Sequence, residues 1–551
     1  MYVKSGPWAA MLSRALVVAS VLSAALIGRA ASAADAPAYF DETQVTTLFA
    51  FDDVSIPHSQ NLRLEMRKPT RHPANPVLAR GPAGSVDALG VQFYGSILRE
   101  KGLGENSKYR LWYVAVDDDV ENKVPYSRWR AAYAESDDGV HWTKPNLGLV
   151  EFHGNKENNL ILTDPAPLGF VNLKVLADPD DADPARRYKI STHAYFQHQS
   201  RLGTLAPFAS ADGLRWKLLV PAELKDAQLQ KKDLVLPAIH FEPSGGLYKW
   251  DGLFYACGQN ALSATRPYQG RVTRMFHSRD FVHWSHTSSI GFIREPQHKV
   301  LGPGRSLEGE QTHEGISVWN RRNLLLGIVG IWHGAPEWKD ISIDLGFVVS
   351  NDGVRFREPA HEWRFLELGP DGAWDQGGLL QGQGFENIGD QTFVYYGSWD
   401  PRTWKKQAPR GGVGIAVLPR DRFGELVVEL KGKGPGDYQL PEITSEFITA
   451  TIPVKGAGPK KFYLNADGLG DDAALRIELL DDLERPLPGY SGADAAVVRT
   501  SGFQTPIAWN GKTEVRDLPE RVRVHAVFEG KRNTDIRFSA IYMREGGEGN
   551  R

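Results

Sequence analysis

Acidic residues stand at comparable points along this chain, each near a run of β-branched and aromatic residues. Our candidates for catalysis are Asp87, Asp178, Glu242 and Glu314. Two carboxyl groups that meet in one site can cleave a glycosidic bond, because one protonates the leaving oxygen and the other attacks the sugar or activates water. The sequence therefore predicts a carboxylate site, on condition that the fold brings these acids together.

The four acids have different expected roles. Glu242 or Glu314 would be the general acid, and the sequence leaves this choice open. Asp87 would be the nucleophile or base, and Asp178 would hold sugar hydroxyls or tune the pKa of the acid. Structural alternatives exist for two of them: Asp178 lies in the turn-like segment "DPDDADP", and Glu242 could cap a strand or pair with an arginine.

Polar and aromatic residues near these acids are candidates for binding a sugar. Aromatic rings can stack on sugar faces, and imidazole, amide, amino and carboxyl groups can bond hydroxyl groups. The candidates are Tyr94, Lys174, His240, His313, Trp319, Asp375 and Gln376. No spacing of Cys and His residues spells out a metal site, so no metal ligands are expected.

A seven-residue phrase repeats through the middle of the chain and indicates what positions these residues. The phrase "SDDGVHW" at 136–142 returns in similar form at 210–216, 278–284 and 350–356, about every 70 residues. Its Ser and Asp can bond nearby backbone N–H groups, its Gly allows a positive φ, and its aromatic residue packs back onto a sheet. Each copy ends a unit of short strands, and a fifth unit has Pro419-Arg420-Asp421 at the Ser-x-Asp position.

Five units of about four strands each predict an all-β fold with a five-bladed β-propeller over residues 45–430. The early strand 45–53 belongs to no unit and would complete the fifth blade. The first strand of every unit would line the axial funnel, where the candidate acids would converge. Residues 431–445 form a linker rich in Gly and Pro, and alternating apolar residues within 446–545 predict a C-terminal β-sandwich.

The N-terminus and the composition limit the location and partners of the protein. Residues 1–34 combine basic residues, an apolar run and a small-residue cleavage site, which predicts a signal peptide, a secreted or periplasmic protein, and no membrane attachment after cleavage. The formal net charge of −3 without a basic tract argues against nucleic-acid binding. Cys257 is the only cysteine, so no internal disulfide can form. No organic cofactor is expected, a structural calcium ion has no motif to support it, and the oligomeric state stays open.

The five units, the "SxDGxxW" turns and the acids at the start of each unit resemble the five-bladed propeller glycoside hydrolases of families 32 and 43 and their relatives. A C-terminal sandwich is also similar to family 32. The resemblance implies a nucleophile or base Asp, a second Asp in an Arg-Asp-Pro motif and an acid Glu, from the first three blades. "ADP" at 177–179 matches the second motif with Ala in place of Arg, and "FEP" at 241–243 puts Glu242 at the acid. The first blade lacks Asn-Asp-Pro-Asn-Gly, and Asp87 is its nearest acid, which indicates a divergent branch.

These observations favour a secreted glycoside hydrolase acting on a polysaccharide or oligosaccharide. A non-catalytic carbohydrate-binding propeller is the first alternative, since the first-blade motif is missing. A glycoside phosphorylase is the second, and it would need a cationic cluster for phosphate, for which His240, Lys174 and Arg305 are conceivable. A protein–protein scaffold is the third, and it would show a flat aromatic face in place of an acidic funnel.

Overall fold

The computed structural model of this chain describes most of the sequence after residue 38. The described residues are 39–100, 108–119, 127–195, 205–219, 242–260, 271–285, 287–294, 309–335, 337–402, 409–429, 444–456 and 458–545. The expected signal peptide, His240, Arg305 and residues 431–443 of the expected linker lie outside them.

The regular structure of the described residues consists of β-strands and short 3-10 helices, which confirms the all-β prediction. The 3-10 helices are η2 (Glu42–Gln44), η3 (Pro184–Arg186), η4 (Trp338–Asp340), η6 (Gly492–Asp494) and η7 (Asn533–Asp535). None of the helices in the described part of the chain is long and apolar enough to cross a membrane.

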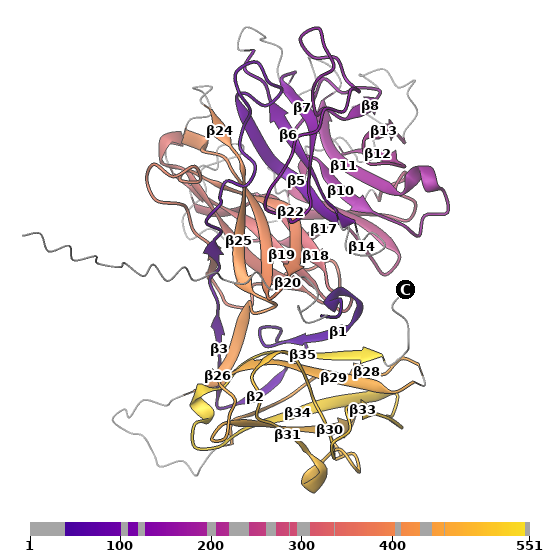
Figure 1. Cartoon of the computed structure of the whole chain (residues 1–551), viewed down its shortest axis with the longest axis vertical. Coiled ribbons are helices and arrows are strands. Elements are labelled where there is room, and N and C mark those ends of the chain that lie inside the picture. The colour runs from indigo at the N-terminus through magenta and orange to yellow at the C-terminus, as the bar shows by residue number, and fades with distance from the viewer. Residues whose placement is uncertain are drawn as a thin grey trace, which may run out of the picture. The chain divides into compact units, whose positions relative to one another are not determined.

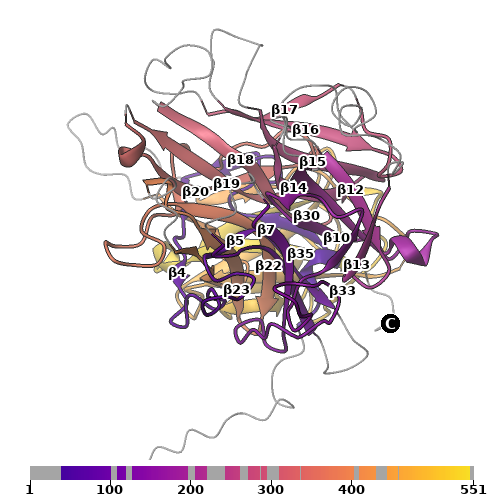
Figure 2. The ribbon, with the colours of Figure 1, turned by 90° about the horizontal axis from the view of Figure 1, so that it is seen from above.

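Five groups of strands form antiparallel meanders that follow the five sequence units. The first meander has β5 (Gly90–Glu100), β6 (Lys108–Val116) and β7 (Trp129–Ser136). The second has β10 (Lys174–Ala177), β11 (Tyr188–Tyr195), β12 (Leu205–Ser210) and β13 (Arg215–Leu218). The third has β14 (Glu242–Trp250), β15 (Leu253–Asn260), β16 (Val272–Ser278) and β17 (Ser289–Phe292). Figure 2 shows this third meander running outward from β14 to β17.

The remaining meanders have the same order. The fourth has β18 (Gly309–Asn320), β19 (Leu325–Gly334), β20 (Ser342–Ser350) and β21 (Arg364–Leu366). The fifth has β22 (Leu379–Ile388), β23 (Gln391–Ser398), β25 (Val413–Pro419) and β4 (Thr70–Arg71). Short strands are added at the margins: β8 (Leu162–Asp164), β9 (Gly169–Phe170) and β24 (Arg410–Gly411) pair with β13, β11 and β5.

The strand that completes the fifth meander is not the one expected from the sequence. The expectation for 45–53 was wrong, because β1 (Thr46–Phe49) pairs with β35 (Arg537–Glu545), and β4 pairs with β25 instead. An apolar strand pattern shows that a strand is buried but does not name its partner. Thr47, Leu48 and Phe49 are all buried in this pairing, so burial against the C-terminal strands decides it.

Two further sheets share one hydrophobic core near the C-terminal end of the sequence (Figure 1). One sheet has the order β3-β26-β35-β29-β32, and the other has the order β2-β27-β34-β30-β31. Their members besides β35 are β2 (His58–Gln60), β3 (Leu62–Met66), β26 (Gly424–Val428), β27 (Glu446–Ile448), β29 (Lys460–Asp467), β30 (Ala474–Asp481), β31 (Ala496–Val498), β32 (Gly502–Pro506) and β34 (Arg521–Glu529), with β28 (Ile452–Pro453) and β33 (Glu514–Val515) at the margins. Strands β1, β2, β3 and β26, which the sequence assigned to the repeat region, therefore pair with the C-terminal strands.

The repeated turns have the local structure that the sequence predicted. In the first turn Asp138 accepts hydrogen bonds from the backbone N–H groups of Val140 and His141, at 2.8 and 2.7 Å. The Gly139 N–H donates to the Ser136 hydroxyl at 2.9 Å, and Gly139 has a φ of 77°. The aspartates of the other three copies make the same two backbone contacts. These aspartates are structural.

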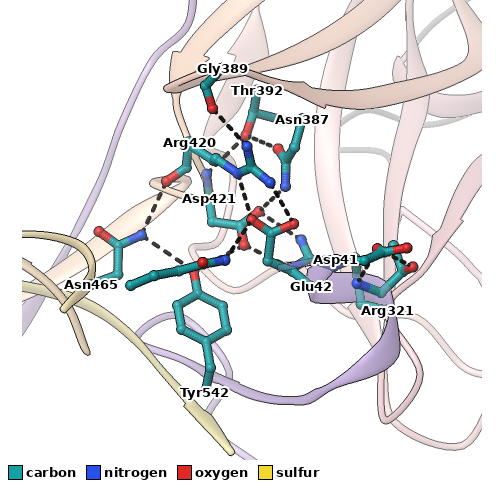
Figure 3. A network of polar contacts seen from close by, with 12 residues as sticks. Asp41, Glu42, Arg321, Asn387, Gly389, Thr392, Arg420, Asp421, Asn465 and Tyr542 are labelled. Carbon is teal, nitrogen blue, oxygen red and sulfur yellow. Dashed lines mark hydrogen bonds and ion pairs between the residues drawn. The ribbon is translucent and has the colours of Figure 1, made fainter. Parts of the chain in front are cut away.

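The fifth turn uses its aspartate differently. Asp421 has a φ of 59° and is fully buried, and it accepts two hydrogen bonds from Arg321, at 2.7 and 2.8 Å (Figure 3). Its carboxylate also accepts from the Tyr542 hydroxyl at 2.9 Å and from the Asn387 amide at 3.1 Å. Asp421 therefore joins the fourth meander, the fifth meander and the C-terminal strand β35.

Candidate active site

The first strands of the five meanders lie against one another. β5 and β22 pair in parallel, with Ser96 opposite Gln383. The Leu173 N–H, which precedes β10, donates to the Tyr94 carbonyl of β5 at 3.0 Å. The Leu247 N–H of β14 donates to the Gln383 side chain at 2.9 Å. Residues at the start of these strands are thus brought together, as the repeat predicted.

Glycines allow the strands β14 and β18 to approach at backbone distance. A Cβ atom on Gly245 would lie 2.6 Å from the Ile316 nitrogen, and one on Gly315 would lie 2.8 Å from the Gly258 Cα atom. Any larger residue at these places would push the strands apart. The close approach places Glu242, at the start of β14, beside Glu314 of β18.

A β-bulge re-aims the chain at the start of four of these first strands. The pairing register shifts between Gln92 and Ser96, Glu242 and Gly246, His313 and Ile316, and Gln381 and Phe385. In β18 the bulge gives Glu314 a φ of 59°, which is uncommon for a residue other than Gly. Bulges that redirect a side chain are frequent beside active sites.

Glu242 and Glu314 are held by one amide group, that of Gln259 on β15. The Gln259 Nε2 atom donates to Glu314 Oε1 at 2.9 Å and also to Glu242 Oε2. The Gln259 Oε1 atom accepts from the Glu314 backbone N–H at 3.1 Å. The amide therefore fixes Glu314 at two points and keeps the Glu242 carboxyl group next to it.

The environment keeps Glu314 protonated. Burial raises its pKa well above the ordinary value, and the Glu242 carboxylate raises it further, whereas Arg271 lowers it. Tyr94 experiences the same surroundings: burial, Glu314 and Glu242 together raise its pKa well above the usual range. A carboxylic acid that stays protonated near neutral pH beside an ionised partner is the arrangement that general-acid catalysis needs.

His313 sits between two indole rings next to this pair. Its ring centroid lies 5.4 Å from that of Trp332 and 5.9 Å from that of Trp399, with interplanar angles of 25° and 13°. Its Nδ1 atom is 3.1 Å from the Tyr94 hydroxyl, and its Nε2 atom is 3.9 Å from Glu314 Oε1. Burial, assisted by Arg271, lowers the His313 pKa well below 6.5, so the imidazole is neutral. When Tyr94 donates to Nδ1, the ring hydrogen lies on Nε2 and faces Glu314.

Arg271 is the described cation of this site. It lies just before β16, and its guanidinium carbon is 4.1 Å from the centroid of the Trp332 ring. It lowers the pKa of Glu314 and of His313, which shows that it faces both. An arginine on an aromatic face is well placed to bind hydroxyl or anionic groups of a ligand.

Asp87 and Asp375 lie at equivalent places outside this cluster. Asp87 accepts from the Tyr113 hydroxyl at 2.8 Å and pairs with Lys144 at 2.5 Å, while its remaining bonds are to Gly81 and Ser85. Asp375 accepts from the Tyr396 hydroxyl at 2.9 Å and from Arg71 at 2.8 Å. Both end a "GPxGxxD" segment, at 81–87 and 369–375, a second internal repeat. The structure brings neither aspartate into contact with Glu242 or Glu314.

Asp178 and Trp319 lie toward the other ends of the first strands. Asp178 follows β10 and pairs with Lys189 at 2.8 Å and with Lys249, near the end of β14, at 2.9 Å, contacts that lower its pKa despite burial. Trp319 is near the end of β18, and its ring stacks on Phe385 with centroids 5.6 Å apart. Glu242 and Glu314 lie nearer the starts of β14 and β18.

A cavity of about 710 Å³ is found at those far ends. It is lined by residues of all five first strands, among them Ile97, Val175, Leu247, Trp319 and Phe385. The cavity therefore continues the axis of the meanders beyond Lys174, which is fully buried between it and the acid pair.

The remaining sequence candidates have local roles or are not described. The Gln376 side chain accepts from the Gly372 N–H at 2.7 Å within its own turn. His240 lies outside the described residues. In the described part of the chain, no three His, Cys, Asp or Glu side chains are placed to hold a metal ion.

Several residues of the cluster were not predicted from the sequence: Gln259, Arg271, Trp332 and Trp399. The signal that could have found Gln259 is the position of "ACGQN" in the strand after "FEP", because neighbouring antiparallel strands place Gln259 opposite Glu242. The two Trp residues belong to the fourth and fifth units, and their convergence depends on the ring of meanders.

Comparisons with known proteins gave distant likenesses of fold. No family model matches the chain, and no curated protein matches it. Similar solved structures include one described under the GH130 family of mannoside phosphorylases, which "contains glycoside hydrolases that target beta-1,2 mannosidic linkages in Candida mannan", at 15% identity and a TM-score of 0.42, covering 64% of this chain and 95% of that one. An N-acetylgalactosamine deacetylase from F. plautii has 16% identity and a TM-score of 0.39, covering 63% and 97%. A family 43 arabinoxylan arabinofuranohydrolase from Bacillus subtilis has 13% identity and a TM-score of 0.37, covering 85% and 99%.

Glycoside hydrolases are thus among the solved structures that this chain resembles, as its sequence motifs predicted. The same comparison contains an enzyme of different chemistry, the deacetylase. A fold can host many activities. The activity of this chain therefore has to come from its own residues.

Proposed function

We propose that this protein is a secreted glycoside hydrolase that cleaves a polysaccharide or oligosaccharide with Glu314 as its general acid. The observation that carries the proposal is the Glu242–Gln259–Glu314 cluster, in which two carboxyl groups share one amide donor and burial keeps Glu314 protonated. In this proposal the five meanders are the blades of a five-bladed propeller, and the two C-terminal sheets are a β-sandwich.

The proposed reaction uses the two glutamates in different states. Glu314 gives its proton to the glycosidic oxygen as the bond from that oxygen to the anomeric carbon breaks. The Glu242 carboxylate either attacks the anomeric carbon or takes a proton from the water that does so, and water supplies the new hydroxyl group. We place Glu242 in this role rather than Asp87, because the bonds of Asp87 to Tyr113 and Lys144 commit it to its own meander.

The residues around the pair support binding of a neutral sugar. The amide of Gln259 holds both acids, and neutral His313 is fixed between Trp332 and Trp399. Arg271 and the indole rings offer the combination of hydrogen-bond donor and aromatic surface that sugar sites use. We propose no organic cofactor, and addition of a chelator to the purified protein tests whether calcium contributes.

The experiment that tests the proposal is sugar release by the mature protein from a panel of glycans. The panel contains fructans, arabinans, xylans, sulfated algal glycans and aryl glycosides. Each is incubated with the wild-type protein, Glu242→Gln, Glu314→Gln and the control Glu478→Gln, whose buried carboxylate pairs with Arg476 and His525 in a C-terminal sheet. We expect release by the wild type and the control and its loss in the other two.

Two results would replace this proposal with an alternative. Retained binding of one glycan by all four proteins without release would identify a carbohydrate-binding protein. Release that depends on inorganic phosphate and yields a sugar phosphate would identify a phosphorylase. Arg271 is the described group that could bind phosphate, whereas Lys174 is fully buried and its three N–H groups are occupied.

A further inference from the structure

Lys174 is a fully buried ammonium group bonded to strands of several meanders. It lies on β10, and its Nζ atom donates to the Gly95 carbonyl of β5 at 3.3 Å, to the Gln381 carbonyl of β22 at 3.0 Å and to the Ser317 hydroxyl of β18 at 3.2 Å. The Ser317 hydroxyl is in turn 2.8 Å from the Gly245 carbonyl of β14. Lys174 and Ser317 thus connect the first strands of all five meanders at one level.

The partners of Lys174 are neutral oxygen atoms. Three N–H groups meet three acceptors, but no carboxylate forms an ion pair with this ammonium. Lys189 is an instructive contrast, because it is equally buried and pairs with Asp178 and Asp181 at 2.8 Å each. An ammonium group without such a partner is costly to bury, and burial lowers the Lys174 pKa to about 7.

This level of the fold lies close to the acid pair. Ser317 follows Glu314 by three residues on β18, and Gly245 follows Glu242 by three residues on β14, so the separation is on the order of 10 Å. The contact with Gln381 is more direct. The Gln381 amide donates to the carbonyls on either side of Glu314, those of His313 and Gly315, at 2.5 and 2.8 Å, while the Gln381 backbone is held by Lys174.

We infer that Lys174 is a positioning residue for the acid pair: it fixes the strands that carry Glu242 and Glu314, and its positive charge favours ionisation of the pair. This inference rests on the proposed function. The other ionisable groups around the two glutamates and Lys174 are Tyr94, Cys257, Arg271 and His313. Tyr94 and His313 are neutral, and burial raises the Cys257 pKa to about 12, so Lys174 and Arg271 are the cations that act on the pair.

The test reads the protonation of Glu314 without requiring turnover. Infrared spectra of the mature protein, recorded from pH 4 to 9, contain a carbonyl band for each protonated carboxyl group. We expect a band that persists above the ordinary glutamic acid range, of about 4.3, and that is absent in Glu314→Gln. In Lys174→Gln, which removes the charge and keeps an N–H donor, the band should persist to a pH about one unit higher, because a cation at this distance no longer favours the carboxylate. The matched control Lys189→Gln should leave the midpoint unchanged.

The outcomes separate the inference from the function on which it rests. A wild-type spectrum without a persistent band would contradict the proposed role of Glu314. A persistent band whose midpoint is the same in Lys174→Gln would overturn the inference about Lys174 alone. If a substrate has been found, the decline of kcat/KM at high pH should move in Lys174→Gln by the same amount as the band.

A second measurement decides the matter if Lys174→Gln does not fold, as judged by near-ultraviolet circular dichroism. Coupling between two titrating groups is reciprocal. Protein labelled with ¹³C at lysine Cε should show one lysine that titrates near pH 7, and its midpoint should fall by about one unit in Glu314→Gln. An unchanged midpoint, or no lysine titrating in that range, would overturn the inference.

Discussion

Gln259 holds Glu314 at two points, since its amide nitrogen donates to the carboxyl group and its amide oxygen accepts from the backbone N–H. The same nitrogen donates to Glu242. One side chain thus determines both the position of the proposed acid and its separation from the second carboxyl group. The proposed chemistry depends on this relationship.

Replacement of Gln259 by Met should therefore lower kcat by at least about 10-fold while changing KM little, because a misplaced acid weakens the transition state more than binding. Steady-state kinetics on the substrate found in the glycan panel measure this. Gln504→Met is the control, because Gln504 lies in the C-terminal strand β32. Equal kinetics for the two variants would show that Gln259 does not position the acid.

The raised pKa of Glu314 predicts how activity and stability vary with pH. Activity should fall as pH rises through this pKa, well above the ordinary value of about 4.3. A raised pKa in the folded state means that the contribution to the free energy of unfolding is complete below about pH 4.3 and is lost as pH rises through the folded pKa. Urea unfolding of the wild type and Glu314→Gln at several pH values should show the wild type losing stability relative to the variant over this range. Parallel curves would be inconsistent with a raised pKa.

His333 predicts a second pH effect, of stability alone. Burial would lower its pKa, but hydrogen bonds with Asp344 and Glu310 raise it to about 9. The associated stability is present below about pH 6.5 and is lost as pH rises through about 9. His333→Gln should remove up to about 3 kcal/mol at pH 6 and much less at pH 10. Thermal melts at both pH values test this, and an equal loss at the two would contradict it.

Asp87 and Asp375 form a matched pair for testing a structural role. Each is buried, accepts from a tyrosine hydroxyl and pairs with a cation. Asp87→Asn and Asp375→Asn should lower the melting temperature by similar amounts, for a loss of about 1–3 kcal/mol each, and leave comparable activity. Loss of kcat by several orders of magnitude in Asp87→Asn alone would restore Asp87 as the nucleophile or base.

The buried ion pair of Arg321 and Asp421 predicts a large loss of stability on removal of one partner. Asp421→Asn leaves the Arg321 charge without its carboxylate and should cost about 3–5 kcal/mol. The exposed pair of Lys68 and Glu367 serves as the control, and Glu367→Gln should cost at most about 1 kcal/mol. Denaturant unfolding measures both, and similar losses would mean that burial of the Arg321–Asp421 pair has no special weight.

Local features of the fold could be predicted from the sequence, whereas long-range partners could not. The Ser-x-Asp-Gly turns depend on bonds within a few residues, so their structure follows from the residue types. The partner of strand 45–53 depends on contacts with residues about 500 positions later, which no local pattern names.

The same distinction applies to the site. Glu242 and Glu314 meet because they occupy similar places near the start of adjacent first strands, which the repeat revealed. Asp178 and Trp319 were grouped with them, but they lie at the far ends of those strands, and the sequence gives no separate sign of which end faces a ligand. Gln259 comes from a second strand and reaches the pair only through the bulge and the close approach of β14 and β18.

The central claim is that Glu314 donates the proton to the leaving oxygen. The most direct measurement compares Glu314→Gln with the wild type on the natural glycan and on a nitrophenyl glycoside of the same sugar, whose leaving group needs little protonation. We predict that kcat on the glycan falls about 100- to 10,000-fold and falls far less on the nitrophenyl glycoside. Wild-type rates of glycan cleavage by Glu314→Gln would contradict the account.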